Sequence, residues 1–172
     1  MLKYVYLAAT FSWLLLLQAC GQSNSGAYDV MLRGLYKNTV PQISAEALKQ
    51  KLQENPDVVL LDTRSNSEYA VSHLKDARFI NFEEFDISRL DTISKNTPIV
   101  LYCSVGARSE QIGEKLLKAG YTEVYNLYGG IFKWVNEGNP VYSTKGKTKK
   151  VHAYSRSWGI WLQKGEKVYG TE

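Results

Sequence analysis

Cysteine and histidine are scarce in this chain of 172 residues, which has only Cys20, Cys103, His73 and His152. Two thiols are too few for the dense disulfide framework of small secreted proteins. The same scarcity argues against a site with several zinc ligands, and we expect no metal or other cofactor. A C-x-x-C motif is also lacking, which argues against a disulfide oxidoreductase.

An excess of charge of one sign is lacking too. Lysine and arginine number 21 and aspartate and glutamate 17, so the formal net charge is only +4. This excess is too small and too dispersed to indicate a nucleic-acid partner. Hydrophobic residues make up 44% and charged residues 22%, as in ordinary globular proteins. The length suits one domain with tails.

A nearly unbroken apolar run from Val5 to Leu17 follows a single positive charge at Lys3. It is shorter than the roughly 20 residues that a helix needs to span a bilayer. A short apolar run behind a positive charge, followed by a polar stretch, is typical of an export signal. We therefore interpret residues 1–19 as a signal peptide.

Residues 17–20 read Leu-Gln-Ala-Cys, which resembles a bacterial lipobox. The resemblance implies lipidation of Cys20, with residues 20–39 as the lipidated N-terminus and tether. The mature protein would then be a membrane-anchored lipoprotein facing the periplasm or the cell exterior. Simple secretion and an uncleaved anchor are the alternatives.

From residue 40 onward, helical and strand-like patterns alternate. Ser44 is a candidate helix N-cap, and Ser65 with Glu68 has the spacing of a capping box. Alternating elements of this length predict an α/β fold with a mainly parallel sheet covered on both faces, which binds ligands at the carboxyl ends of its strands. Strands are expected at 58–61, 77–82, 98–102 and 124–127, and helices at 44–55, 85–93, 109–119 and 131–137, with a further short helix that begins at Ser65.

The C-terminal part differs in composition. Four lysines fall within residues 145–150, which we interpret as a basic linker. Beyond it the chain is rich in aromatic residues, and we expect this extension to dock on the domain because exposed tryptophans are unfavourable in water. Two roles stay open, shaping an acceptor pocket or fastening the tail, for the side chains of His152, Tyr154, Trp158 and Trp161.

Cys103 directly follows a predicted buried strand and is followed by a short loop with Gly106, by Arg108 and by a helix. The first turn of a helix has unpaired amides, and the helix dipole adds positive potential there. With Arg108, these groups favour negative charge at the loop centre, first of all the Cys103 thiolate. The alternative is a buried structural cysteine beside an ordinary loop.

Cys103-x-x-Gly106-x-Arg108-Ser109 resembles the active-site loop of the rhodanese-type sulfurtransferases. Ser72 departs from the family, which usually has glycine before the histidine at this place. Further segments resemble family motifs in the correct order over about residues 42–142: Leu61-Asp62-Thr63-Arg64, Glu68-Tyr69, His73-Leu74, residues 77–81, Leu127-Tyr128-Gly129-Gly130-Ile131 to Trp134, and Gly138-x-Pro140-Val141.

The resemblance implies a rhodanese-like fold with a five-stranded central sheet over residues 40–144, followed by residues 145–172 as basic linker and extension. It also implies sulfur transfer through a persulfide on Cys103, from thiosulfate or a persulfide donor to cyanide or a thiol. No partner beyond these small molecules and the membrane is expected, and the protein should be a monomer. The implied substrate-binding residues are Ser104, Val105, Gly106, Ala107, Arg108 and Ser109.

Other interpretations stay open. A rhodanese-like domain can serve as a persulfide carrier or binding module without turnover. Phosphatases of the related fold place five residues between cysteine and arginine, whereas four separate Cys103 from Arg108, so a phosphatase is disfavoured. Asp62 and Arg64 could support donor binding, but we favour an ion pair that braces the loop. His73 could act as a base, although a packed structural histidine is favoured.

Overall fold

The computed structural model describes residues 26–170. The chain divides after Leu35 into two compact units, and the described part of the first, 26–35, is helical. The predicted signal peptide and Cys20 lie outside the described residues. Within residues 26–170, no helix is both long and apolar enough to cross a membrane.

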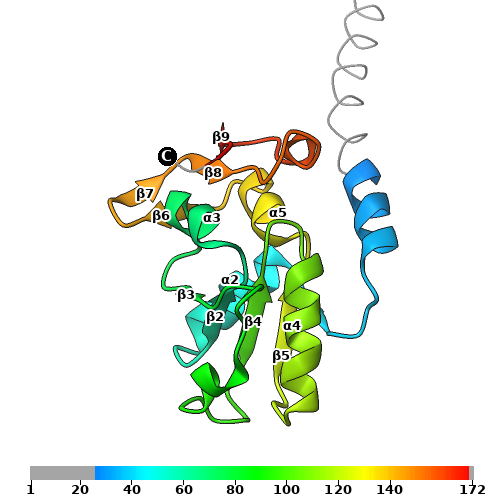
Figure 1. Ribbon diagram of the computed structural model, residues 1–172, viewed down its shortest axis with the longest axis vertical. Helices are drawn as coiled ribbons and strands as arrows, with labels where there is room; N and C mark the ends of the chain where they lie inside the picture. The colour runs from blue at the N-terminus through cyan, green and yellow to red at the C-terminus, as the bar shows by residue number, and fades with distance from the viewer. Residues whose placement is uncertain (1–25, 171–172) are drawn as a thin grey trace, which may run out of the picture. The chain divides into compact units, whose positions relative to one another are not determined.

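A parallel five-stranded sheet forms the centre of the second unit (Figure 1), as the sequence predicts. The neighbouring strands pair in register, for example Leu60 with Val100 and Val100 with Tyr125. All the carboxyl ends therefore lie at the same edge of the sheet. The strand order is β1 (Gln42–Ile43), β5 (Val124–Leu127), β4 (Ile99–Tyr102), β2 (Val59–Asp62) and β3 (Arg78–Phe79).

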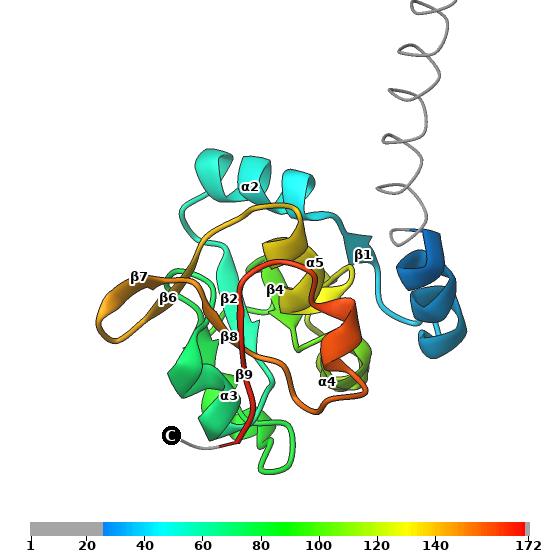
Figure 2. The same cartoon turned by 90° about the horizontal axis from the view of Figure 1, so that it is seen from above.

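Helices cover both faces of this sheet. Helix α4 lies on one face, and α2 and α5 lie on the other (Figure 2). Ser44 caps α2 by accepting a hydrogen bond from the Ala47 amide, and Ser65 with Glu68 forms the predicted capping box of α3. The helical elements are α2 (Ala45–Glu54), α3 (Asn66–Val71), the 3₁₀ turn η1 (Ile87–Leu90), α4 (Ala107–Lys118) and α5 (Gly130–Asn136).

The strands β2 and β4 are buried along their whole length. Leu61 and Leu101 belong to the core cluster beneath α4, with Ile112 and Leu116 of that helix. Side chains alternate along a strand, so the intervening residues face the opposite layer. Both layers exclude water, which explains why the sequence shows continuous apolar runs instead of alternation.

Two predicted elements are shorter than expected. The strand predicted at 77–82 is limited to Arg78–Phe79, because Asp76 and Asn81 adopt left-handed backbone conformations (φ 59° and 39°) on either side. The helix predicted at 85–93 is reduced to the single turn η1.

From here on the name extension refers to residues 141–170, which include the predicted linker at 145–150. Residues 145–150, interpreted from their lysines as a linker, instead supply the turn and second strand of a hairpin and the start of β8. Lysines project into solvent from a short edge strand as readily as from a linker, so composition did not separate the two. Val151 and Ala153 are fully buried, and β8 contacts α3. The extension contains β6 (Val141–Ser143), β7 (Gly146–Thr148), β8 (Lys150–His152), the 3₁₀ turn η2 (Gly159–Trp161) and β9 (Glu166–Val168).

Candidate active site

Cys103 begins the loop between β4 and α4, at the carboxyl edge of the sheet. Its sulfur accepts a hydrogen bond from the Gly106 amide, with an N–Sγ distance of 3.1 Å. The amides of Val105, Ala107 and Arg108 have no acceptor among the described residues, as is usual where a helix begins. Cys103 is a free cysteine and only 1% exposed. Cys103 is therefore buried, yet its sulfur faces a main-chain amide, that of Gly106.

The turn after β5, which contains Gly129 and Gly130, and the start of α5 hold this loop through main-chain hydrogen bonds. The amides of Ile131 and Phe132 donate to the carbonyls of Cys103 (2.9 Å) and Ser104 (3.1 Å). Any side chain on Gly130, whose φ is 56°, would run into these two carbonyls. Glycine at position 130 is thus a requirement of the close approach between α5 and the loop.

Tyr36 holds the other side of the loop. Its hydroxyl donates to the Val105 carbonyl (2.6 Å) and accepts from the Gly129 amide (2.9 Å). Burial raises the pKa of Tyr36, so the hydroxyl stays a donor. Gly106 has a φ of 100°, and a side chain there would strike Tyr36. Sequence reasoning missed Tyr36, because a lone tyrosine ahead of the first strand carries no periodic or motif signal.

Arg108 lies in a network with Glu68 and Ser104. The guanidinium donates to both carboxylate oxygens of Glu68 (2.9 and 2.8 Å) and to the Ser104 hydroxyl (3.1 Å). The Ser104 hydroxyl in turn donates to Glu68 at 2.7 Å. Burial alone would raise the pKa of Glu68, but the hydrogen bonds and charge of Arg108 lower it to about 2. Arg108 also interacts with Cys103, which brings positive charge next to the sulfur.

Ser109 supports the loop from inside. Its hydroxyl lies 2.7 Å from the Asn126 side-chain oxygen and 3.1 Å from the Gly106 carbonyl. The Asn126 amide donates to the same carbonyl at 3.0 Å. Ser109 has no exposed surface, so this hydroxyl faces the protein and not the mouth of the loop. Ala107, half-buried, and Val105, buried, complete the predicted set.

Asp62 and Arg64, the predicted supporting residues, form an ion pair with no exposed side-chain surface, at 2.7 Å. Arg64 also donates to the Ser72 carbonyl (2.5 Å) and so ties β2 to the end of α3. This geometry favours the bracing role over contact with a donor. The His73 ring stacks on Tyr69, with centroids 4.1 Å apart, which fits the packed role.

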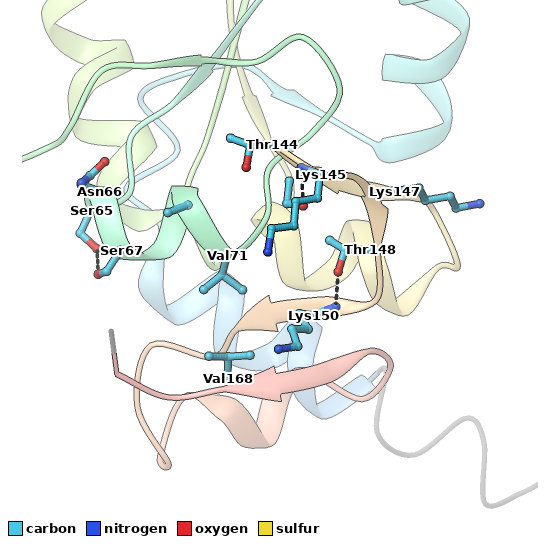
Figure 3. Close-up of a pocket in the computed structure, with 12 residues that line it drawn as sticks. Ser65, Asn66, Ser67, Val71, Thr144, Lys145, Lys147, Thr148, Lys150 and Val168 are labelled. Atoms are coloured by element: carbon cyan, nitrogen blue, oxygen red, sulfur yellow. Dashed lines mark hydrogen bonds between the residues drawn. The ribbon is translucent and has the colours of Figure 1, made fainter. Parts of the chain in front are cut away.

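A separate pocket of about 790 Å³ lies between α3 and the extension (Figure 3). No residue of the Cys103 loop lines it, so it does not belong to the arrangement around Cys103. The Lys147 side chain points away from the other labelled residues. The lining residues are Ser65, Asn66, Ser67, Ala70, Val71, Ser143, Thr144, Lys145, Lys147, Thr148, Lys150 and Val168.

In residues 26–170, no group of three or more His, Cys, Asp or Glu side chains is placed to hold a metal ion. The arrangement offers one sulfur nucleophile, an amide aimed at it and a neighbouring guanidinium. Such a site can stabilise a thiolate or a persulfide anion and can hold an anionic ligand above it.

Comparison with known proteins identifies the family. Residues 44–137 match the model of the Rhodanese-like domain, and the chain belongs to this family of sulfur-transfer proteins. It is 37% identical over 107 residues to a sulfurtransferase of Allochromatium vinosum, covering 62% of this chain and 99% of that protein.

Two further relatives are matched over only part of their own length. A tRNA uridine(34) hydroxylase of Picosynechococcus is 37% identical over 92 residues, covering 50% of this chain and 30% of the relative. The YrkF protein of Bacillus subtilis, named as a sulfur carrier, is 30% identical over 100 residues, covering 58% of this chain and 54% of YrkF. Among solved structures, the rhodanese-like domain of the Anabaena protein Alr3790 is similar, with a TM-score of 0.55 and 28% identity over 60% of this chain and 79% of that one.

Proposed function

We propose that this protein is a sulfurtransferase that moves sulfane sulfur from thiosulfate or a small persulfide to cyanide or a thiol, through a persulfide on Cys103. The observation that carries the proposal is the Gly106 amide 3.1 Å from the Cys103 sulfur, inside a loop whose neighbouring amides have no acceptor within residues 26–170. These donors stabilise negative charge on the first sulfur and on the sulfur transferred to it.

In the first half-reaction, the Cys103 thiolate attacks the outer sulfur of the donor. With thiosulfate, a new S–S bond forms to Cys103 and the S–S bond of thiosulfate breaks. Sulfite leaves with the bonding electron pair, and the enzyme keeps a persulfide anion. Arg108 offsets the negative charge that accumulates, and Glu68 fixes its orientation by the bidentate pair.

In the second half-reaction, the acceptor attacks the outer persulfide sulfur. Cyanide forms a C–S bond and leaves as thiocyanate, and the S–S bond electrons return to the Cys103 thiolate. A thiolate acceptor leaves as a persulfide by the same displacement. Neither step needs an external acid or oxidant, which agrees with a loop that holds a single cysteine and no histidine.

Thiocyanate formation from thiosulfate and cyanide tests the proposal, with Cys103→Ser as the variant and Ser109→Ala, in the first turn of α4, as a matched change. We expect Cys103→Ser to abolish thiocyanate formation and Ser109→Ala to retain it at a reduced rate. Equal rates for the wild type and Cys103→Ser would refute the proposed function.

A persulfide carrier is the second candidate, favoured by the burial of Cys103, which is only 1% exposed. Mass spectrometry of the protein after one exposure to donor separates the two functions. A carrier retains one extra sulfur atom on Cys103 and releases it only to a protein partner, whereas an enzyme turns over with small acceptors.

We further propose that the chain is exported and anchored by lipid on Cys20, facing the periplasm or the cell exterior. The support is the apolar run behind Lys3 and the Leu-Gln-Ala-Cys segment at 17–20. Incorporation of labelled fatty acid in a bacterial host should be lost in Cys20→Ser and kept in Cys103→Ser. Labelling that is equal in both variants would contradict the anchor.

A further inference from the structure

The extension lies outside the family match, yet it crosses the end of the sheet where β4 runs into α4 (Figures 1 and 2). Strands β8 and β9 pair in parallel, with His152 opposite Val168, and the Ala153 amide donates to the Val168 carbonyl at 2.9 Å. The next residue, Tyr154, places its ring over Arg108, with 5.2 Å between the guanidinium carbon and the ring centroid. The extension therefore contacts the catalytic loop directly.

The backbone at Tyr154 adopts an unfavourable conformation. Its φ is 63°, and the Ser155 amide donates to the Ala153 carbonyl at 2.8 Å, which closes a three-residue turn around Tyr154. Turns of this kind with positive φ are rare and strained, and bulky side chains seldom occupy them. The Tyr154 amide also donates to Nδ1 of the buried His152 at 3.1 Å, which holds the turn in place. Strain of this kind gathers at functional sites.

The position of the ring fits a role in access to the sulfur. Glu68 and Ser104 accept hydrogen bonds from the edges of the Arg108 guanidinium, and the Tyr154 ring covers its face. Tyr154 is 52% exposed, whereas the nearby Cys103 is 1% exposed.

We propose that Tyr154 is a specificity-determining residue that narrows the approach to Cys103. Small donors and acceptors reach the sulfur past the ring, and bulky thiols react slowly. The inference rests on the proposed sulfur transfer, which it deepens by assigning the size limit on the substrate to the extension.

Alkylation of Cys103 tests the inference without relying on sulfur transfer. The full chain is treated with iodoacetamide and with the bulky fluorescein maleimide, and peptide mass spectrometry separates Cys103 from Cys20. Tyr154→Gly should raise the ratio of bulky to small reagent rates by about tenfold, the lower end of steric discrimination in pockets. Glycine adopts positive φ readily, so this variant removes the ring without straining the turn.

Two variants complete the design. Tyr154→Phe keeps the ring and should keep the wild-type ratio. Tyr125→Ala removes a comparable cation–ring contact, with Lys51 at 5.0 Å, on another part of the sheet and should also leave the ratio unchanged. An unchanged ratio in Tyr154→Gly, with its melting temperature at or above that of the wild type, would overturn the inference.

Turnover supplies the second readout. If sulfur transfer occurs, Tyr154→Gly should raise kcat/KM for glutathione relative to cyanide by a similar factor. Loss of activity in every form of the protein would refute only the proposed sulfur transfer. The alkylation ratio would still test the role of Tyr154, because it reports on access to Cys103 without any sulfur transfer.

Discussion

Two carboxylate–arginine pairs lie near α3, and they differ in what surrounds them. Asp62 and Arg64 have no exposed side-chain surface. In the second pair, Glu68 is buried but Arg108 keeps 21% of its side chain exposed and lies against Cys103 and Tyr154. The same chemical pair thus braces the fold when it is sealed inside and tunes a site when one edge meets solvent.

The largest effect on stability is expected when the sealed pair is broken. Arg64→Leu leaves the Asp62 carboxylate buried without its cation, which should cost about 3–5 kcal/mol of unfolding free energy in urea titrations. Adding Asp62→Asn to this variant removes the uncompensated charge and should recover part of the loss. A loss below about 1 kcal/mol in Arg64→Leu would show that this pair contributes little.

Arg108→Leu, in contrast, should reduce activity more than stability. We expect sulfur transfer to fall about 10²–10³-fold, because a charged group beside the reacting sulfur is lost. The loss of stability should be smaller than in Arg64→Leu, since Glu68 keeps its hydrogen bonds from Ser104 and Ser65. Thiocyanate assays and urea titrations measure both, with the exposed Arg78→Leu as control. Activity equal to that of Arg78→Leu would refute the role of Arg108.

Acid should also weaken the second pair. The pKa of Glu68 lies at about 2 in the folded protein against an ordinary value of 4.5. Its stabilising contribution is therefore complete above pH 4.5 and is lost as the pH falls from there toward 2. Urea midpoints measured along this range should decline less in Glu68→Gln than in the wild type. Parallel declines would contradict the shift.

The smallest effect on stability concerns an unsatisfied hydroxyl next to the pair of Asp62 and Arg64. The Ser72 hydroxyl is buried and has no hydrogen-bond partner among the described residues. Ser72→Ala removes this unsatisfied group and should raise the unfolding free energy by about 1 kcal/mol. Arg64 bonds to the Ser72 carbonyl, which the substitution keeps. A clear destabilisation in thermal unfolding would indicate a partner for the hydroxyl.

The sequence predicted the central sheet well because its signals are local. Continuous apolar runs located β2 and β4, and the Ser65–Glu68 spacing predicted the capping box of α3. The loop around Cys103 was recognisable because a cysteine, a glycine and an arginine stand at fixed positions before a helix. Each of these features is decided by neighbours within a few residues.

Long-range features could not be read in this way. The partner of Arg108 is Glu68, 40 residues away, and sequence reasoning assigned Glu68 to the cap of a helix and to a family motif but not to Arg108. The contact of Tyr154 with Arg108 depends on how β8 pairs with β9, and these strands of three residues carry no periodic pattern. Gly130 was named as part of a family motif, whereas its closeness to the Cys103 carbonyl is visible only in three dimensions.

The Tyr36 hydroxyl has a practical consequence for anyone who prepares this protein. It links the Val105 carbonyl to the Gly129 amide from a position before residue 44, where the family match begins. A recombinant fragment trimmed to the limits 44–137 would lose that link, together with the contact of Tyr154 with Arg108. A fragment with these boundaries should therefore react more slowly or discriminate less between small and bulky substrates, and measurements on it would underestimate the selectivity of the full chain.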